Sequence, residues 1–471
     1  MKRFAWRWFA INSARGLCLA SVVLGTALLA GAETRPQYGG TLHIAMHAAP
    51  TSLDPADQNQ MDSFARRSLT QLMFDTLVAA DRNGRLQASL AESWQASDGD
   101  RRWQFRLRRG VKFDDGTPLT SEIAAASLRI ANPAWKVSAD SDSVIIEPGA
   151  GDPELAEELS LARNAIVKRN ADGKLGGTGA FHVVDWQPGK KLSLAANENC
   201  WRGRPFLDGI EIEMGKSYRD QAMSLESGRA DMIEVPAEQA HRAELEGRTV
   251  VSSLPVELLA LVFRTDAASP TDKALREALA LSVERNSIRN VLLQGAGQPA
   301  GGILPTWMSG YGFVFPTDAD LARARHDREQ VLNIPAWSLG YDASDPLARL
   351  LAERVVLNAR DAGLTVQPAS TAIPDLKLMR IPLASANPWI ALENVAGSAG
   401  LPAMKSKTDS VEELYAAELA ALATQRMIPL FHLPASYAAT AALKNWAVQA
   451  DGSLDLTSAW LRSYQPWSNQ P

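Results

Sequence analysis

The sequence has few of the residue types that build metal sites and disulfide scaffolds. Its 471 residues include two cysteines, Cys18 and Cys200, and six histidines. Two cysteines exclude a disulfide framework and a cysteine-rich zinc or iron–sulfur site. His43 and His47 are the one close histidine pair, and in a strand they would lie roughly 13 Å apart, too far for one metal ion. We therefore expect no metal or redox cofactor.

The chain also lacks sequence motifs of enzymes and of nucleic-acid-binding proteins. It contains no H-E-x-x-H, no G-x-S-x-G and no P-loop sequence. A glycine cluster at 176–179 precedes a strand-like segment rather than a helix, which predicts a tight turn and not a phosphate-binding loop. The formal net charge is −5, and no basic block is present. We therefore expect a protein that is not an enzyme and binds no nucleic acid.

Residues 1–32 have the layout of a secretory signal peptide. Basic residues at positions 2, 3, 7 and 15 precede an apolar run at 16–29, and small residues at 30–32 form a cleavage site. The run is shorter than the roughly 20 residues that cross a bilayer, and no second long apolar run follows. We expect cleavage and a periplasmic mature protein; the alternative is an uncleaved membrane anchor.

Strand and helix signals alternate along most of the chain. A predicted strand at 336–341 is followed by a helix with Asp345 as its N-cap and Pro346 at its first position. The same order of strand, helix and strand recurs at 210–235. Residues 94–120 instead alternate polar and apolar side chains between Asp-Gly turn signals, which predicts antiparallel hairpins. The pattern is typical of an α/β protein with a β-rich insertion.

Three further signals mark helix boundaries in the second half of the chain. A helix is indicated from Thr271 or Asp272, and Asn286 is expected to cap its continuation. Ser410 and Glu413 form a capping box ahead of another helix, which precedes an apolar strand at 428–433.

Five ordered segments of the chain are similar to those of one known family. They are the opening strand and loop at 38–55, the sequence LAESW at 90–94, and the segments at 105–120, 177–208 and 273–288. Together they resemble the family 5 extracellular solute-binding proteins, which deliver dipeptides, oligopeptides or nickel chelates to ABC importers. The similarity covers nearly all of the chain after residue 32.

This resemblance implies a two-lobed, periplasmic-binding-protein-like α/β fold with hinge strands and a reduced β-rich subdomain on the first lobe. The first lobe would contain residues 33–70, 165–250 and 435–471, and the subdomain residues 71–164. The second lobe would contain residues 251–434. The hinge strands are expected near 245–255 and 430–440, so that the lobes close over a solute between them.

The implied function is that of an extracytoplasmic substrate-binding protein of an ABC importer. Such a protein captures a peptide or peptide-like solute by hinge closure and delivers it to the transmembrane permease subunits. We expect a monomer without a cofactor. The alternatives are a ligand-presenting sensor or scaffold with the same fold, and a secreted hydrolase.

The resemblance also places the ligand-binding residues, and at one of them the sequence departs from the family. The candidates are Ala49, Thr51, Tyr341, Arg380, Ala384, Ser385, Asn387 and Trp389. In peptide binders of the family, an acidic residue at the position of Ala384 receives the ligand's α-ammonium group, and a tryptophan stands where Ile381 is here. Because the loop from Leu383 to Trp389 has no charge, we expect a neutral or N-blocked ligand. The alternative is that another carboxylate of the second lobe binds the amine.

Overall fold

A computed structural model describes residues 35–311, 315–369, 373–404 and 410–462. The predicted signal peptide at 1–32 lies outside the described residues. Within them, no helix combines the length and the hydropathy that a membrane span requires.

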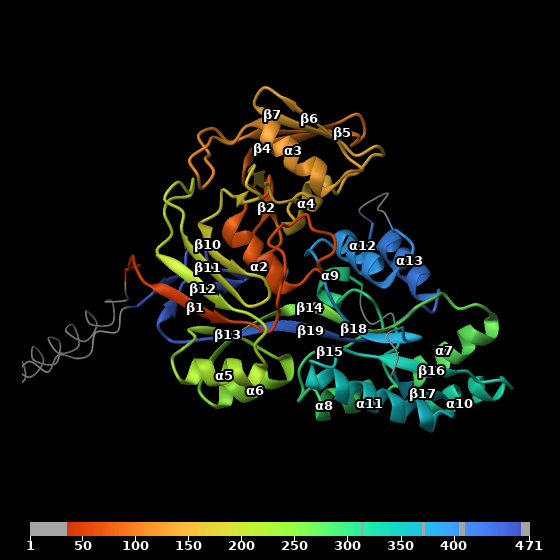
Figure 1. Cartoon of the computed structure of the whole chain (residues 1–471). Coiled ribbons are helices and arrows are strands. Elements are labelled where there is room, and N and C mark those ends of the chain that lie inside the picture. The colour runs from red at the N-terminus through yellow and green to blue at the C-terminus, as the bar shows by residue number, and fades with distance from the viewer. Residues whose placement is uncertain (1–34, 312–314, 370–372, 405–409, 463–471) are drawn as a thin grey trace, which may run out of the picture.

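One mixed sheet of eleven strands runs through the molecule (Figure 1). In spatial order its path contains β10 (Phe181–Gln187), β11 (Lys191–Ala196), β12 (Gly209–Glu213), β1 (Thr41–Ala45), β13 (Met232–Val235), β19 (Met427–Ala439), β14 (Thr249–Phe263), β18 (Leu376–Pro382), β16 (Ala336–Gly340) and β17 (Thr365–Pro368). A short strand, β15 (Gln298–Pro299), also pairs with β19. β1 is parallel to β12 and β13, and β16 is parallel to β17 and β18.

The long strands β14 and β19 belong to both lobes. They pair with each other in antiparallel orientation, while β13 of the first lobe pairs with the end of β19 and β18 of the second lobe pairs with the end of β14. The register between them shifts around Pro255, which lies opposite Pro434, because proline cannot donate to the ladder. The two hinge strands therefore lie where the sequence predicted them.

Helices cover both faces of the sheet in the first lobe. α2 (Phe64–Met73) lies on the upper face, and α5 (Tyr218–Glu226) and α6 (Ala237–Leu245) lie on the lower face (Figure 1). Ser63 caps α2 by accepting a hydrogen bond from the backbone N–H of Arg66. Leu69 and Leu72 of α2 are buried against strand residues such as Ile210, which makes the core of this lobe.

The β-rich subdomain is a separate layer above the first lobe. Its antiparallel sheet contains β4 (Ala91–Ser97), β5 (Arg102–Leu107), β7 (Ser143–Glu147) and β6 (Lys136–Asp140), and α3 (Ser121–Ala131) packs against it. Shorter elements connect this layer to the lobe: β2 (Val78–Ala80), β3 (Leu86–Ala88), α4 (Leu155–Glu158), a 3₁₀ helix (Ala162–Asn164), β8 (Lys168–Arg169) and β9 (Leu175–Gly176). Phe105 and Phe113 are buried in its own core. The predicted antiparallel hairpin structure is confirmed by β4 and β5.

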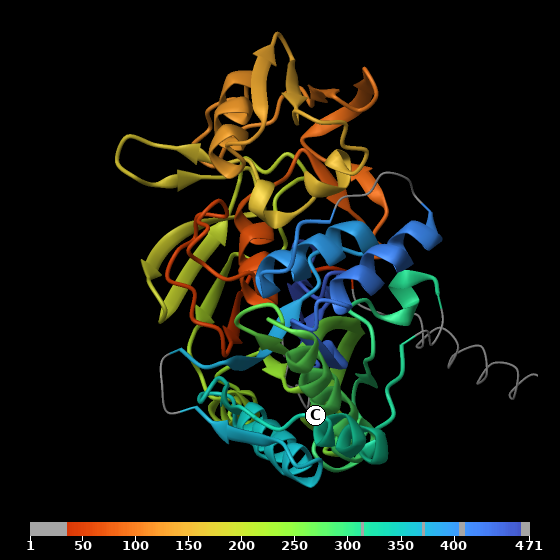
Figure 2. The ribbon, with the colours of Figure 1, turned by 90° about the vertical axis from the view of Figure 1, so that its right-hand side faces the viewer.

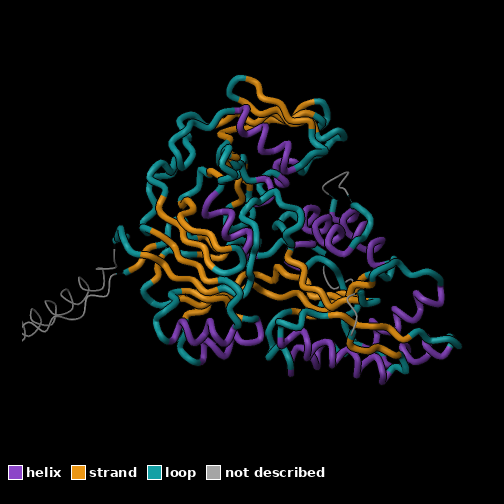
Figure 3. The backbone as a smooth tube through the Cα atoms, viewed as in Figure 1, coloured by secondary structure: helices purple, strands orange, loops and turns teal. Residues whose placement is uncertain are grey.

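The second lobe also has helices on both faces of its sheet (Figure 3). The lower face carries α7 (Pro270–Ser282), α8 (Arg285–Val291), α10 (Leu321–Glu329) and α11 (Pro346–Asp361), and the upper face carries α9 (Thr306–Ser309), α12 (Pro388–Ala399) and α13 (Val411–Leu422). Figure 2 shows the blue helices α12 and α13 below the orange subdomain. The chain then returns to the first lobe through β20 (Leu443–Lys444), β21 (Ala447–Val448), β22 (Leu454–Asp455) and β23 (Trp460–Leu461).

The domain boundaries stay a prediction, and packing supports one adjustment. α2 continues to Met73 and contributes to the core of the first lobe, whereas Leu77 is buried in the core of the subdomain. We therefore propose that the subdomain begins after α2 rather than at residue 71.

Local capping signals were predictive in some helices and not in others. Asp345 accepts from the N–H of Leu347 at 2.9 Å and Ser410 accepts from the N–H of Glu413 at 3.1 Å, as predicted. The helix predicted from Thr271 or Asp272 begins earlier, because Ser269 is its N-cap and Pro270 its first residue. Asn286 is not a cap, since α8 begins at Arg285.

The glycine cluster at 176–179 packs against the end of α2. A Cβ atom on Gly177 would overlap the carbonyl oxygen of Met73, and one on Gly179 would lie 2.5 Å from the carbonyl carbon of the same residue. β10 follows at Phe181, so the cluster leads into a strand as predicted. Glycine is needed here for the close approach of two backbones.

Candidate functional site

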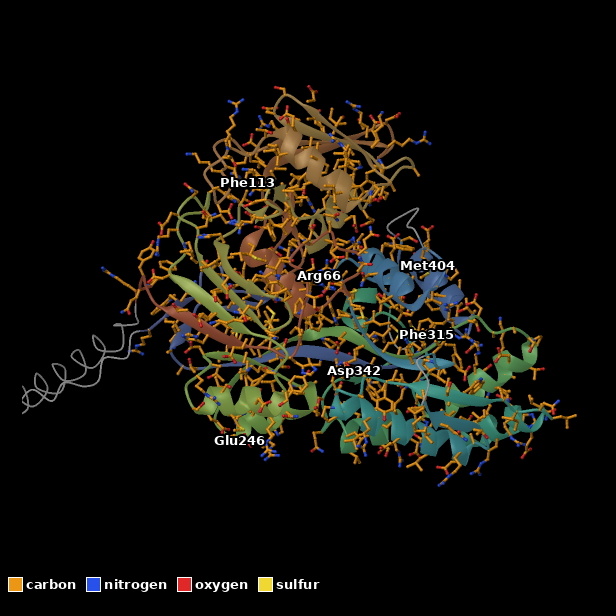
Figure 4. The ribbon with its side chains drawn as sticks, in the orientation of Figure 1. Arg66, Phe113, Glu246, Phe315, Asp342 and Met404 are labelled. Atoms are coloured by element: carbon orange, nitrogen blue, oxygen red, sulfur yellow. The ribbon has the colours of Figure 1, made fainter. Side chains whose placement is uncertain are left out.

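A cavity of about 750 Å³ lies between the two lobes and is called the first compartment here. Its lining comes from the loop at 55–62 and the start of α2, from subdomain residues between 131 and 163, and from α12 with Met404. Figure 4 shows Arg66 and Met404 on its two sides. The carboxyl end of β18 leads directly into its wall, which is the usual place for a ligand in an open α/β sheet.

Two adjacent arginines at the start of α2 organise the wall on the side of the first lobe. Arg66 donates to four backbone carbonyls of residues 54–60, at 2.7 to 3.0 Å, and so fixes that loop. Arg67 is 3% exposed, pairs with Asp62, and donates to the carbonyls of Leu383 at 2.8 Å and Asp451 at 2.9 Å. Arg67 therefore connects α2 both to the second lobe and to the C-terminal segment.

Charge pairing leaves this compartment with an excess of carboxylates. Its lining includes six acidic side chains and three arginines. Burial raises the pKa of Asp62, but the charge of Arg67 prevails and holds that pKa below its ordinary value. Arg163 pairs with Glu158 at 2.6 Å. The described lining therefore has a formal excess of three carboxylates over guanidinium groups.

Three contacts join the loop after β18 to the opposite side of the cleft. The Asn387 side-chain amide donates to the carboxylate of Glu154 in the subdomain. Ala384 and Ile390 form a small apolar cluster with Leu161. The third contact is the hydrogen bond from Arg67 to Leu383 described above. The two lobes are thus in contact in this structure.

A second compartment of about 270 Å³ adjoins the first, and Ala384 lines both. Its walls are the β2–β3 hairpin, Trp201 and Arg202, the segment 449–457, and residues 384–386. Arg202 pairs with Asp75, which also accepts hydrogen bonds from the Trp201 indole at 2.9 Å and the Thr178 hydroxyl at 2.8 Å.

A third cavity, the rear crevice, lies between the lobes, is lined by residues from the start of α2 to the starts of α5, α6 and α11, and has a volume of about 210 Å³. Asp342, which is labelled in Figure 4, is one of the residues that line it. Arg380 lies within it and forms ion pairs with Glu257 at 2.8 Å and Asp345 at 3.1 Å. Burial lowers the pKa of Arg380, but the neighbouring carboxylate of Glu257 prevails and the pKa is raised. The His47 ring stacks on Tyr218 with ring centres 4.7 Å apart.

The first and second compartments together form the main cleft, and four of the predicted ligand-binding residues lie together there. Ala384 lines both compartments, Ser385 lines the second, and Trp389 lines the first. Asn387 caps α12 with its side-chain oxygen and contacts the subdomain with its nitrogen.

The other four predicted residues lie elsewhere. Arg380 lines the rear crevice instead of the main cleft. In the part of the chain that the structure describes, these three cavities are not lined by Ala49, Thr51 or Tyr341. The Thr51 hydroxyl accepts from Gln60 at 2.9 Å, and Tyr341 packs on the core below the sheet of the second lobe.

The sequence did not point to several residues that build the cleft. Arg66 and Arg67 are visible only as an adjacent basic pair at a helix start, which is common on solvated helices. Asp451, Asp455 and Ser89 come to the cleft through long-range packing of the C-terminal segment and the β2–β3 hairpin. No local pattern in the sequence predicts that approach.

One known protein family matches most of this chain. Residues 85–373 match the family described as bacterial extracellular solute-binding proteins, family 5 Middle. The chain belongs to this family. The predicted resemblance is thereby confirmed.

Curated relatives within the family have different named ligands. The chain is 24% identical over 297 residues to the nickel-binding protein NikA of Staphylococcus aureus, covering 60% of this chain and 59% of that protein. It is 26% identical over 342 residues to the probable D,D-dipeptide-binding periplasmic protein DdpA of Escherichia coli, covering 65% of each. The matched segments thus span less than two thirds of these relatives. In the part of this chain that the structure describes, no group of three histidine, cysteine or acidic residues could hold a metal ion.

Solved structures confirm the fold of this family 5 protein. The dipeptide-binding protein of Pseudoalteromonas sp. SM9913, in complex with Met-Leu, has a TM-score of 0.79 at 15% sequence identity. That comparison covers 90% of this chain and all of the other, at 100%. The two-lobed α/β fold predicted from the sequence is therefore confirmed.

Proposed function

We propose that this family 5 protein is the extracytoplasmic substrate-binding component of an ABC importer, and that it captures a peptide or peptide-like solute between its lobes. The observation that carries the proposal is the main cleft, whose walls come from both lobes while two continuous strands connect them. A solute in such a cleft contacts both lobes only when they are closed. The names of the curated relatives, which are binding proteins, support binding over catalysis.

The mechanism is hinge closure around β14 and β19. The register between these strands breaks at Pro255, and beside the break the hydroxyls of Ser252 and Ser436 lie 2.7 Å apart. Closure brings Asn387 to Glu154 across the cleft. A solute that binds both walls stabilises this state by its difference in affinity between the open and closed forms.

Partners and location follow from the same proposal. The closed protein presents both lobes to the transmembrane permease subunits, acts as a monomer, and needs no cofactor. Removal of the signal peptide at 1–32 would release it into the periplasm. Loss of solute uptake on deletion of the gene, rather than loss of a signalling response, distinguishes an importer component from a ligand-presenting sensor.

The experiment that tests the proposal combines mass and shape. Native mass spectrometry of protein purified from its own host should detect a bound solute. X-ray scattering should give a smaller radius of gyration with the solute than after its removal by unfolding and refolding. A radius that stays the same although the solute is bound would reject hinge closure.

A further inference from the structure

The second compartment places aspartates of the first lobe opposite the loop that contains Ala384. Asp81 belongs to the β2–β3 hairpin, and Asp451 and Asp455 belong to the C-terminal segment. One nitrogen of Arg67 donates both to the carbonyl of Leu383 and to that of Asp451, which fixes these two backbone segments beside each other. The acidic wall therefore lies across the cleft from the position where the family's acidic residue is missing.

Each of these aspartates uses one carboxylate oxygen to hold its own turn. Oδ1 of Asp81 accepts from the N–H groups of residues 83 and 85 at 2.8 and 2.9 Å. Oδ1 of Asp451 accepts from the N–H of residue 453 at 3.0 Å, and Oδ1 of Asp455 from that of residue 457 at 3.1 Å. The guanidinium group of Arg82 lies beside Asp455, with one nitrogen 3.9 Å from Oδ2. Oδ2 of Asp81 accepts from the Gln87 side-chain amide at 3.2 Å. Among the described residues, Oδ2 of Asp451 accepts no hydrogen bond and forms no ion pair, so it keeps the greatest capacity to bind a cation.

The described lining of this compartment does not neutralise that charge. Its cationic side chain is Arg202, which already pairs with Asp75. Backbone N–H groups, that of Arg85 first, lower the pKa of Asp81, so this carboxylate is ionised near neutral pH. A cationic group entering the compartment would meet the carboxylates of Asp81, Asp451 and Asp455, while Arg202 is already paired with Asp75 and Arg82 lies beside Asp455.

Two buried polar atoms independently indicate a polar occupant. The hydroxyl of Ser89, whose residue is 2% exposed, and Oε1 of Gln449 have no hydrogen-bond partner among the described residues. Both residues line the second compartment. Buried polar groups in folded proteins are nearly always paired, so these two atoms have unused capacity to accept a hydrogen bond beside this compartment. An ammonium group has three donors and suits two such acceptors beside a carboxylate.

We infer that the second compartment binds the primary ammonium group of the solute, with Asp451 and Asp455 as its carboxylate partners and Ser89 and Gln449 as further hydrogen-bond acceptors. This inference rests on the proposed function and names the chemistry of its solute. The amine anchor has moved from the second lobe to the first. Under this inference the ligand has a free ammonium group, in place of the neutral or N-blocked ligand that the loop around Ala384 alone led us to expect.

The first experiment compares a mixture of tripeptides with free amino termini and the same mixture after N-acetylation. Native mass spectrometry of the full mature protein should detect free tripeptides at least tenfold more often than acetylated ones. A simple polyamine also presents a primary ammonium group. A parallel titration with putrescine therefore tests whether the site binds a polyamine or a peptide amino terminus. Equal binding of the two mixtures, or binding of neither, would overturn the inference.

Variants then test the named residues. Asp451→Asn and Asp455→Asn keep the oxygen that holds each turn but remove the charge, so the fold should persist while tripeptide affinity falls about tenfold in each. Asp172→Asn is the matched control, because Asp172 holds a similar turn in the β8–β9 hairpin outside the lining of this compartment. Its affinity should be unchanged.

Charge exchange across the cleft gives the sharpest test. Ala384→Asp in the Asp451→Asn background returns a carboxylate to the same compartment from the opposite wall, and tripeptide affinity should recover severalfold. If Asp451→Asn binds tripeptides as tightly as the parent chain, and the added Ala384→Asp substitution does not raise that affinity, the ammonium site is contradicted. The proposed function would survive that result if the protein still carries a solute from its host and becomes more compact with it.

Discussion

The rear crevice and the second compartment both gather carboxylates between the lobes, but they differ in how that charge is balanced. In the rear crevice, Arg380 lies between Glu257 and Asp345, within 3.1 Å of both. In the second compartment, Asp75 has a guanidinium partner, whereas Asp451 has no ion pair among the described residues. Glu257 and Asp345 are therefore paired with a guanidinium group, whereas Asp451 is not, although Glu234 and Asp342 also line the rear crevice.

This difference separates a structural charge cluster from a binding site. A buried ion pair whose members satisfy each other fixes the conformation of the chain, and removal of one member leaves an uncompensated charge. Carboxylates without a cation, beside unpaired buried hydrogen-bonding atoms, are stabilised instead by an external cation. Substitutions in the two regions should therefore affect different measurements.

The largest effect is expected from Arg380→Gln in the rear crevice. The variant leaves Glu257 and Asp345 buried, with side chains 10% and 11% exposed, and without their cation. The free energy of unfolding should fall by about 3 to 5 kcal/mol, as measured by urea denaturation. Tripeptide affinity should change little, because Arg380 lines the rear crevice and neither compartment of the main cleft.

An exposed ion pair provides the control for this prediction. Arg349 and Glu353 lie one turn apart on α11, with side chains 66% and 48% exposed. Arg349→Gln should cost no more than about 0.5 kcal/mol, because exposed pairs are screened by water. If the two variants lost the same stability, the rear crevice would not be a structural ion-pair site.

A buried histidine, in contrast to these ion pairs, is uncharged in the folded protein near neutral pH. His432 on β19 is 4% exposed, and its Nε2 atom lies 2.9 Å from the carbonyl oxygen of Ile303. Burial lowers its pKa from 6.5 to about 4. As the pH falls from about 6.5 towards 4, the unfolded chain gains a proton that the folded chain does not, so the free energy of unfolding decreases by up to about 3 kcal/mol.

His432→Gln tests this contribution directly. The glutamine amide keeps a donor for the Ile303 carbonyl but does not titrate in this range. Urea denaturation at pH about 7 and about 4.5 should show a smaller loss of stability in the variant than in the parent chain. Carboxylates contribute equally to both proteins, so identical losses would mean that His432 is not buried in its neutral form.

The sequence predicted the parts of this fold that depend on neighbouring residues. Asp345 and Ser410 cap their helices because a short polar side chain lies next to the first free N–H groups, and the sequence shows that adjacency directly. The start of α7 was predicted too late because Ser269 and Pro270 together define the first turn. The hinge strands were located through the family resemblance, since periodicity alone does not show which strands cross between lobes.

The candidate site was less predictable, because its two walls are far apart in the sequence. The loop from Ala384 to Trp389 was found through the resemblance, and the four candidate residues within it line or border the main cleft. Arg380 lies only four positions before Ala384, yet it lines the rear crevice and neither compartment of the main cleft. Asp451 reaches the cleft through its carbonyl contact with Arg67, which no spacing or composition rule predicts.

A smaller effect is expected where the two lobes meet. Asn387→Asp keeps the oxygen that caps α12 but places a second carboxylate against Glu154. Repulsion across the cleft should favour the open form, with a larger radius of gyration and about tenfold weaker tripeptide binding, or about 1.4 kcal/mol. Asn387→Ser also keeps the cap and adds no charge, so it should have a clearly smaller effect. Equal behaviour of the two variants would show that this contact does not control closure.

The smallest effect is expected from Cys200→Ser, outside both charged regions. The side chain is half-buried against the core of the first lobe, and burial raises the pKa of its thiol. A protonated thiol reacts slowly with alkylating reagents, because the thiolate is the nucleophile. We expect slow alkylation of the parent chain and a loss of stability of about 1 kcal/mol or less in the variant. Tripeptide affinity should be unchanged, since Cys200 lines neither compartment. A loss of binding on this substitution would place the ligand against the loop at 197–203 and move the amine site away from Asp451.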